Sequence, residues 1–228
     1  MIEDPPLLQI RHNFPRPTSV QVKACSGLPT GFVVDALNGR GALDPRIKPI
    51  GSVQTFCGVA LPCHAGANDN LAAFGTLTVA KPGDVVLCAT EFFSTASVLG
   101  DLLFGMMKNV GVIAFVTDGL VRDQQGIRAV ELPCFAAGVS PNSPVRSGPG
   151  TVGLPIVIGG VAVGPGDIVI GDEDGVVVVP FSQIDATIER LEGVKAAEAD
   201  FDAKVKGGLK VPGFIQAMVD SGKFLDVD

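Results

Sequence analysis

Residues Gly100–Asp123, GDLLFGMMKNVGVIAFVTDGLVRD, decide the fold of this 228-residue chain. The mostly apolar stretch over Asp101–Lys108 predicts a helix, the residues around Gly111 predict a turn, and the β-branched run over Val112–Val116 predicts a strand. Such a helix spans about 13 Å and such a strand about 18 Å, so the two are antiparallel and similar in length. The start of the helix and the residues after the strand therefore meet at one edge of an α/β fold.

Short apolar runs, interrupted by glycine and proline, fill most of the remaining domain. Their β-branched content predicts strands over 84–89, 156–158 and 176–179. An apolar residue every three or four positions over 183–205 predicts a long helix, which Gly207 and Gly208 end. We therefore predict three parts: an N-terminal arm over 1–30, a single α/β domain over 31–181 and a C-terminal helical tail over 182–228.

A small internal echo supports this picture. The tripeptide Pro82-Gly83-Asp84 recurs as Pro165-Gly166-Asp167, and a β-branched pair follows each copy. A Pro-Gly turn that leads into a strand accounts for both copies without any functional role. Two copies this far apart do not indicate a solenoid, so we expect two layers of strands with related shapes.

The composition indicates a folded protein with a large core, because 46% of the residues are hydrophobic and only 18% are charged. The formal net charge of −7 disfavours nucleic acid as a partner. No apolar run is long enough for a membrane span, and the acidic, proline-containing start does not resemble a signal peptide. Five cysteines without a CxxC pair predict free, buried thiols and a cytoplasmic protein.

The edge where helix and strand meet carries suitable chemistry for a small anionic substrate. Free N–H groups of Asp101, Leu102 and Leu103 at the helix start attract an anion, and Gly100 allows close approach to the backbone. Arg122 offers two parallel donors to a carboxylate, and Asp123 offers hard oxygen atoms to a divalent ion. The alternative is structural: an Arg-Asp pair after a strand is commonly a surface feature, and an aspartate in a first turn is commonly a cap.

The stretch VTDGLVRD resembles the DG-x-VRD signature of the RraA-like family, which contains the regulator of ribonuclease activity A and the 4-hydroxy-4-methyl-2-oxoglutarate aldolases. Other segments agree with that family in order, and the resemblance covers about residues 30 to 180: Asp35–Leu37, Ile47–Pro49, Asp69-Asn70, Pro82–Asp84 and Gly171–Pro180. The resemblance implies an α/β/β/α sandwich like the swivelling domains of phosphohistidine proteins. It also implies a homotrimer or a hexamer with sites at subunit boundaries.

Within that family the aldolases carry an aspartate, twenty intervening residues and then Arg-Asp, as Asp101, Arg122 and Asp123 do here. The resemblance thus implies a lyase that cleaves 4-hydroxy-2-oxo acids to pyruvate. The substrates it implies are 4-hydroxy-4-methyl-2-oxoglutarate or 4-carboxy-4-hydroxy-2-oxoadipate, and also oxaloacetate, which would be decarboxylated. Asp123 would hold Mg²⁺ or Mn²⁺, Arg122 and the amides of residues 101 to 103 would hold the pyruvyl end, and Asp101 would transfer a proton through a water. A glutamate from a neighbouring subunit, matched here by Glu198, would complete the site.

Two other functions stay open at this point. A non-catalytic protein that binds and inhibits ribonuclease E would share the fold and the acidic surface. A phosphohistidine carrier would need a reactive histidine, and the two histidines are His12, in the proline-rich arm, and His64, for which a structural role is the simpler interpretation. The apolar helix residues Phe104, Met106 and Met107 are interpreted as core filling.

Overall fold

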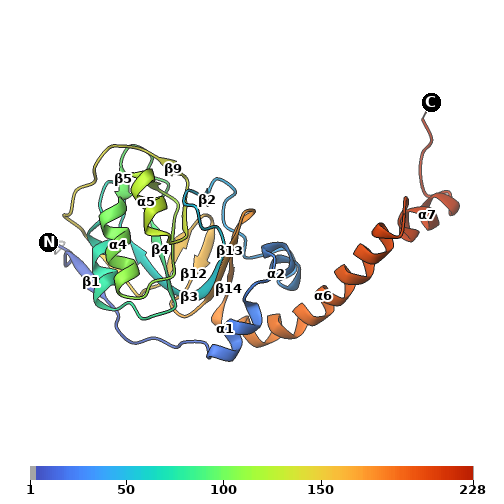
Figure 1. Cartoon of the computed structure of the whole chain (residues 1–228), viewed down its shortest axis with the longest axis horizontal. Helices are drawn as coiled ribbons and strands as arrows, with labels where there is room; N and C mark the ends of the chain where they lie inside the picture. The colour runs from blue at the N-terminus through green and yellow to red at the C-terminus, as the bar shows by residue number, and fades with distance from the viewer. Residues whose placement is uncertain (1–3, 228) are drawn as a thin grey trace.

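The computed structural model describes residues 4–227, and four parallel strands form its centre (Figure 1). These strands lie side by side in the order β3 (Phe56–His64), β4 (Asp84–Ala89), β6 (Ala114–Thr117) and β8 (Cys134–Ala136). Every residue of β4 is buried, as expected for a parallel strand that is covered on both faces. The same sheet continues through β1 (Leu8–Ile10), β10 (Gly150–Val152), β2 (Lys48–Pro49), β13 (Ile168–Asp172) and β14 (Gly175–Val179).

Alternate residues of β4 separate two layers of core, because successive side chains of a strand point to opposite faces. Val86 and Cys88 pack with residues of three helices on one face, namely α3 (Leu71–Gly75), α4 (Asp101–Asn109) and α5 (Gln124–Val130). Val85 and Leu87 pack on the other face with residues of β13 and β14 and of the hairpin β11 (Ile156–Ile158) and β12 (Val161–Val163).

The outer faces of β13 and β14 carry a further core. Ile168, Ile170, Val177 and Val179 pack there against residues of three helices: α1 (Ser19–Cys25), α2 (Thr30–Ala36) and α6 (Ile184–Lys206). The order helices, central strands, second strand layer and helices is visible across Figure 1. The predicted mixed α/β architecture in four layers is confirmed.

Helix α4 begins at Asp101, as predicted, and ends at Asn109, one residue later than predicted. The strand that follows it, β6, begins at Ala114 instead of the predicted Val112. Phe104 and Met107 are fully buried, and the Phe104 ring meets the Phe115 ring edge-on at a centroid distance of 5.5 Å. The interpretation of these two residues as core filling is confirmed. For Met106 that interpretation is wrong, because its side chain is half-exposed and lines the pocket described below.

The repeated Pro-Gly-Asp tripeptides prove to be two copies of one turn. Asp84 Oδ2 accepts a hydrogen bond from the Lys81 amide over 2.9 Å, and Asp167 Oδ2 accepts one from the Gly164 amide over 2.7 Å. Each aspartate thus accepts a hydrogen bond from the amide three residues before it and closes a turn. Asp84 is the first residue of β4, and Asp167 directly precedes β13. The two copies serve β4 in the central strands and β13 in the second strand layer, which confirms the structural interpretation.

The long C-terminal helix α6 packs on the domain only at its start. Ile184, Thr187 and Leu191 are buried, whereas the later turns extend away from the domain toward α7 (Gly213–Asp220) (Figure 1). Two short 3₁₀ turns, η1 (Thr76–Thr78) and η2 (Phe181–Gln183), complete the helical elements. Within residues 4–227, no helix combines the length and the apolar character that crossing a bilayer requires.

All five cysteines are free, four of them are buried and Cys57 is half-buried, as the sequence predicted. Burial raises the pKa of the Cys57 thiol to about 12. It also raises the pKa of the Cys134 thiol well above its ordinary value. These thiols are therefore protonated near neutral pH and inert as nucleophiles.

A second, smaller parallel sheet positions the candidate site. It consists of β5 (Ser97–Leu99), β7 (Leu120–Val121) and β9 (Gly138–Val139) in that order. Each of these short strands follows one of the central strands β4, β6 and β8 along the chain. The small sheet thus lies beyond the carboxyl ends of parallel strands, where α/β sheets bind their ligands.

Candidate functional site

The pairing of β5 with β7 brings two helix starts together. Leu99 is in register with Val121, and the Arg122 amide donates a hydrogen bond to the Leu99 carbonyl over 3.0 Å. Directly after these residues, α4 begins at Asp101 and α5 begins at Gln124. The sequence argument placed Asp101 near Arg122 through helix and strand lengths. In the structure, the pairing of β5 with β7 brings the two helix starts together.

The junction before α4 has no room for a side chain at position 100, so Gly100 is required there. Its φ of −131° is extended backbone that any residue adopts. A Cβ atom at this position would lie 2.2 Å from Asp123 Oδ2 and 3.1 Å from Arg122 Cγ. The sequence suggested that Gly100 admits a ligand to the backbone; the structure shows that the side chains of Arg122 and Asp123 use the space beside it.

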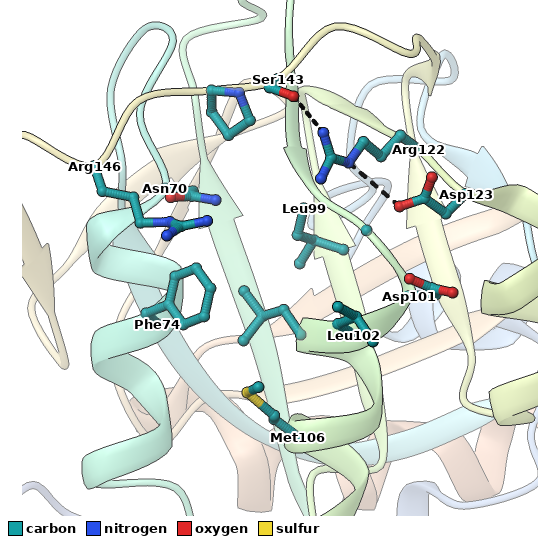
Figure 2. A pocket seen from close by; sticks show the side chains of 13 residues that line it. Asn70, Phe74, Leu99, Asp101, Leu102, Met106, Arg122, Asp123, Ser143 and Arg146 are labelled. Atoms are coloured by element: carbon teal, nitrogen blue, oxygen red, sulfur yellow. Dashed lines mark hydrogen bonds and ion pairs between the residues drawn. The ribbon is translucent and has the colours of Figure 1, made fainter.

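Arg122 and Asp123 form a paired cation and anion at the edge of the pocket (Figure 2). Arg122 Nε lies 3.3 Å from Asp123 Oδ2, and Arg122 Nη1 donates a hydrogen bond to the Ser143 hydroxyl. Asp123 is the residue that precedes α5, and its φ of 59° is left-handed, a conformation that aspartate tolerates better than most residues. Its carboxylate does not cap α5, and among the described residues its side-chain partner is Arg122, through Oδ2.

Asp101 lines the same pocket but lies apart from that pair. Its carboxylate rests against α5, where a Cβ atom on Gly126 would lie 2.1 Å from Asp101 Oδ2. Within residues 4–227, no hydrogen bond or ion pair joins Asp101 to Arg122 or Asp123. The three predicted side chains thus share one cavity, with the Asp101 carboxylate on its α5 side (Figure 2).

The pocket encloses about 380 Å³, within the usual range of roughly 300–1,000 Å³ for small-molecule sites. All six residues predicted for the site line it: Gly100, Asp101, Leu102, Leu103, Arg122 and Asp123. No side chain caps the start of α4, which leaves the first-turn amides for an anion. The pocket therefore combines anion-binding amides, a guanidinium group and two carboxylates.

The far wall of the pocket escaped the sequence analysis. It contains Asn70, which directly precedes α3, Phe74 from the last turn of α3, Ser143, Pro144 and Arg146 from the loop before β10, and Met106 from α4. The only sequence signal was the Asp69-Asn70 segment of the family resemblance. These residues come from segments that are distant in sequence, so spacing arguments could not place them.

The donor set fits magnesium or manganese better than a closed zinc site. Within the described residues, no group of three or more histidine, cysteine, aspartate or glutamate side chains gathers in one place. Magnesium in proteins is commonly held by one or two carboxylates, with waters and substrate oxygens in the remaining positions. Asp123, whose side chain is 46% exposed at the pocket, provides such a carboxylate, and Asp101 lines the same cavity.

His64 is the last residue of β3 and does not line this pocket. Its Nε2 lies 3.1 Å from Glu91 Oε1. That ion pair or hydrogen bond gives the ring a structural partner, in keeping with the simpler interpretation of His64. Glu198, on the exposed part of α6, also lies outside the lining of this pocket within residues 4–227.

Comparison with known proteins identifies the family of this chain. Residues 30–178 match the model of the family described as RraA-like, Aldolase/RraA. A protein of Halalkalibacterium halodurans named "Putative 4-hydroxy-4-methyl-2-oxoglutarate aldolase" is 34% identical over 177 residues, which are 78% of this chain and 83% of that protein.

Two solved structures share the fold. An uncharacterized protein from Pseudomonas syringae pv. tomato is 22% identical with a TM-score of 0.75, covering 86% of this chain and 97% of its own. The RNA-processing inhibitor RraA from Thermus thermophilis is 26% identical with a TM-score of 0.62, covering 67% of this chain and 93% of its own. The fold, the matched residues and the aldolase-named relative agree, and the chain belongs to the RraA-like family.

Proposed function

We propose that this protein is a divalent-metal-dependent aldolase that cleaves 4-hydroxy-2-oxo acids and releases pyruvate. The observation that carries this proposal is the single pocket that gathers Asp101, Arg122 and Asp123 around the free amides of α4. The relative named as a 4-hydroxy-4-methyl-2-oxoglutarate aldolase supports the same reaction class.

The pyruvyl half of the substrate belongs beside Arg122. The guanidinium group, oriented by Ser143 and Asp123, would donate to the 2-oxo group and its carboxylate, and the amides of residues 101 to 103 would add further donors. Asp123 would hold Mg²⁺ or Mn²⁺, which when bound supplies Lewis-acid stabilisation of the enolate charge. Arg122 stabilises the same developing charge from the protein side.

Asp101 is the proton-transfer group of this proposal. It would accept the proton of the 4-hydroxyl group, directly or through one water, while the C3–C4 bond breaks. The electron pair of that bond passes to the 2-oxo group as an enolate, and the 4-hydroxyl carbon becomes a carbonyl. Return of the proton to C3 gives pyruvate, so protons and electrons balance over the cycle.

Oxaloacetate would form the same enolate by losing carbon dioxide. Its C3–C4 cleavage releases the C4 carboxylate and needs no hydroxyl proton to be removed. We therefore propose a decarboxylase side activity that depends on Arg122 and Asp123 as strongly as the aldolase activity does, and on Asp101 less strongly.

We also propose that the protein works as a homotrimer or hexamer in which Glu198 of a neighbouring copy completes the site. The later turns of α6 and the segment that follows expose large apolar side chains such as Phe201, Val205 and Phe214. An exposed apolar surface of this kind favours a partner chain.

The direct test measures pyruvate release from 4-hydroxy-4-methyl-2-oxoglutarate, with Mg²⁺ or Mn²⁺ and with EDTA. The proposal predicts release that the metal restores after EDTA treatment. The alternative function, inhibition of ribonuclease E, is favoured by the structural likeness to RraA. Binding to purified ribonuclease E together with no pyruvate release under any metal would replace the aldolase proposal by that alternative.

A further inference from the structure

The position of Asp101 has a different origin from that of the charged pair beside it. Arg122 and Asp123 contact each other, and Ser143 accepts a hydrogen bond from Arg122. Among residues 4–227, no hydrogen bond or ion pair holds the Asp101 carboxylate. A proton-transfer group has to lie within reach of the proton that it takes, so another contact must position this side chain.

That contact is the surface of α5 at Gly126, toward which the Asp101 carboxylate lies (Figure 2). A Cβ atom on Gly126 would lie 2.1 Å from Asp101 Oδ2, 2.6 Å from Asp101 Cβ and 2.7 Å from Asp101 Cγ. Ordinary van der Waals contact with a Cβ atom begins at 3.4 Å. The three nearest atoms all belong to Asp101, so its side chain fills the volume that a side chain at position 126 would occupy.

The backbone of α5 does not itself require a glycine at this place. Gly126 lies in the first turn of the helix, and its φ is outside the left-handed region. Glycine favours a helix less than every residue except proline. The absence of a side chain at position 126 is therefore explained by the space that Asp101 takes.

Helix α5 is also held along its length, so it cannot simply move away from Asp101. At its start, the pairing of β5 with β7 joins it to α4. At its end, Lys108 Nζ of α4 donates a hydrogen bond to the Val130 carbonyl. Between these points Ile127 is fully buried and packs in the same core as Phe104 of α4. A methyl group at position 126 would therefore displace Asp101 locally.

We propose that Gly126 is a positioning residue for Asp101: because it carries no side chain, it leaves the space in which the Asp101 carboxylate lies on the α5 side of the pocket. This inference rests on the proposed aldolase function, in which Asp101 takes the hydroxyl proton. Gly126 does not line the pocket, so it acts only through Asp101.

The first test measures Gly126→Ala on the two reactions proposed for the site. Ordinary contact between the new methyl group and Asp101 requires a displacement of about 1 Å, which costs on the order of 100-fold in rate. We expect that loss in kcat for cleavage of 4-hydroxy-4-methyl-2-oxoglutarate. Decarboxylation of oxaloacetate, which has no hydroxyl proton to remove, should lose much less.

Gly105→Ala is the matched control for this test. It is also a helical glycine-to-alanine change, but its methyl group on α4 would meet nothing within 4 Å, and both rates should stay unchanged. Equal losses of the two activities in Gly126→Ala would indicate general damage to the pocket and overturn the proposal. Wild-type rates for both reactions would overturn it as well.

The second test asks whether Gly126 acts through Asp101. Two substitutions that affect one group do not add in their effects, whereas independent ones do. In the Asp101→Asn background, where the base is already lost, Gly126→Ala should therefore lower cleavage little further. A second loss as large as the one in the otherwise unchanged chain would contradict the proposal.

A stability measurement separates this inference from the aldolase function, because it requires no catalysis. Gly126→Ala should lower the urea midpoint of unfolding, since the added methyl group overlaps Asp101. In the Asp101→Gly background the overlapping atoms are gone, and the same substitution should raise the midpoint, because alanine favours a helix more than glycine. If Gly126→Ala prevents folding and Asp101→Gly restores it, the contact is supported in the same way.

The two proposals then fail in different ways. If the wild type releases no pyruvate from any hydroxy acid, the aldolase function fails, whereas the reversed effect on the midpoint still supports the placement of Asp101 by Gly126. A midpoint that falls equally in both backgrounds contradicts that placement, whatever the activity.

Discussion

The Arg122 amide donates a hydrogen bond to the Leu99 carbonyl over 3.0 Å, and this contact joins the starts of α4 and α5. Because Gly100 follows Leu99 and Asp123 follows Arg122, the free amides of one helix and the carboxylate before the other lie at one pocket. The chemistry of the site thus depends on two strands of three and two residues, β5 and β7.

Gly100→Ala should damage the site without unfolding the protein. The new methyl group would lie 2.2 Å from Asp123 Oδ2, so the Asp123 and Arg122 side chains must move. Displacements of about 1 Å in an active site cost on the order of 100-fold in rate, and we expect such a loss in kcat/KM for pyruvate release. Gly105→Ala is the matched control, because the added methyl on the same helix meets nothing within 4 Å; full activity in Gly100→Ala would show that this packing is irrelevant.

Asp101→Asn should separate the two reactions proposed for the site. The variant retains the size of the side chain but loses the base, so aldol cleavage should fall by about 100-fold or more, in line with the usual contribution of general acid–base groups. Oxaloacetate decarboxylation, which has no hydroxyl proton to remove, should fall much less. Equal losses in steady-state kcat for both substrates, with unchanged substrate binding, would refute the proton-transfer role of Asp101.

Arg16→Ala should destabilise the fold strongly. Arg16 donates two hydrogen bonds, of 2.5 and 2.9 Å, to Asp84, whose side chain is fully buried. Removing the arginine leaves a buried charge without its partner, and because Arg16 is itself partly exposed we expect a loss of about 3 kcal/mol in the free energy of unfolding. Urea denaturation measures it, with Arg46→Gln as the exposed-pair control that should cost much less; equal losses in the two variants would contradict this account.

The Asp44–Arg46 pair predicts a pH effect with a defined sign. The hydrogen bonds from Arg46 lower the pKa of Asp44 from 3.8 to about 2. Because the folded-state pKa lies below the unfolded one, the pair stabilises the fold fully above pH 3.8, and this contribution is lost as the pH falls through about 2. In Arg46→Gln, NMR titration of the Asp44 carboxyl carbon should show a pKa near the ordinary value, whereas an unchanged low pKa would assign the shift to another group.

The sequence predicted the elements whose pattern is long or strongly β-branched. The strands over 84–89 and 156–158 and the helix that begins at Asp101 were predicted within one residue, because buried strands and amphipathic helices impose a period on apolar residues. The long helix α6 was placed within one residue at each end for the same reason.

The small sheet and the α3 side of the pocket were not predictable in this way. Strands of two or three residues, such as β7 and β9, are too short to show any period. Arg146 reaches the pocket because Asp69 binds the amides of Ser147 and Gly148, a contact across 78 residues. Such contacts depend on side-chain acceptors far away in the sequence, and spacing carries no information about them.

The most direct test of the account is metal-dependent pyruvate release by Asp123→Ala compared with wild type. The account predicts that wild type, stripped with EDTA and supplied with Mg²⁺, cleaves 4-hydroxy-4-methyl-2-oxoglutarate, and that the variant retains its fold by circular dichroism but releases no pyruvate above the uncatalysed rate. Wild-type levels of metal-dependent release in Asp123→Ala would contradict it.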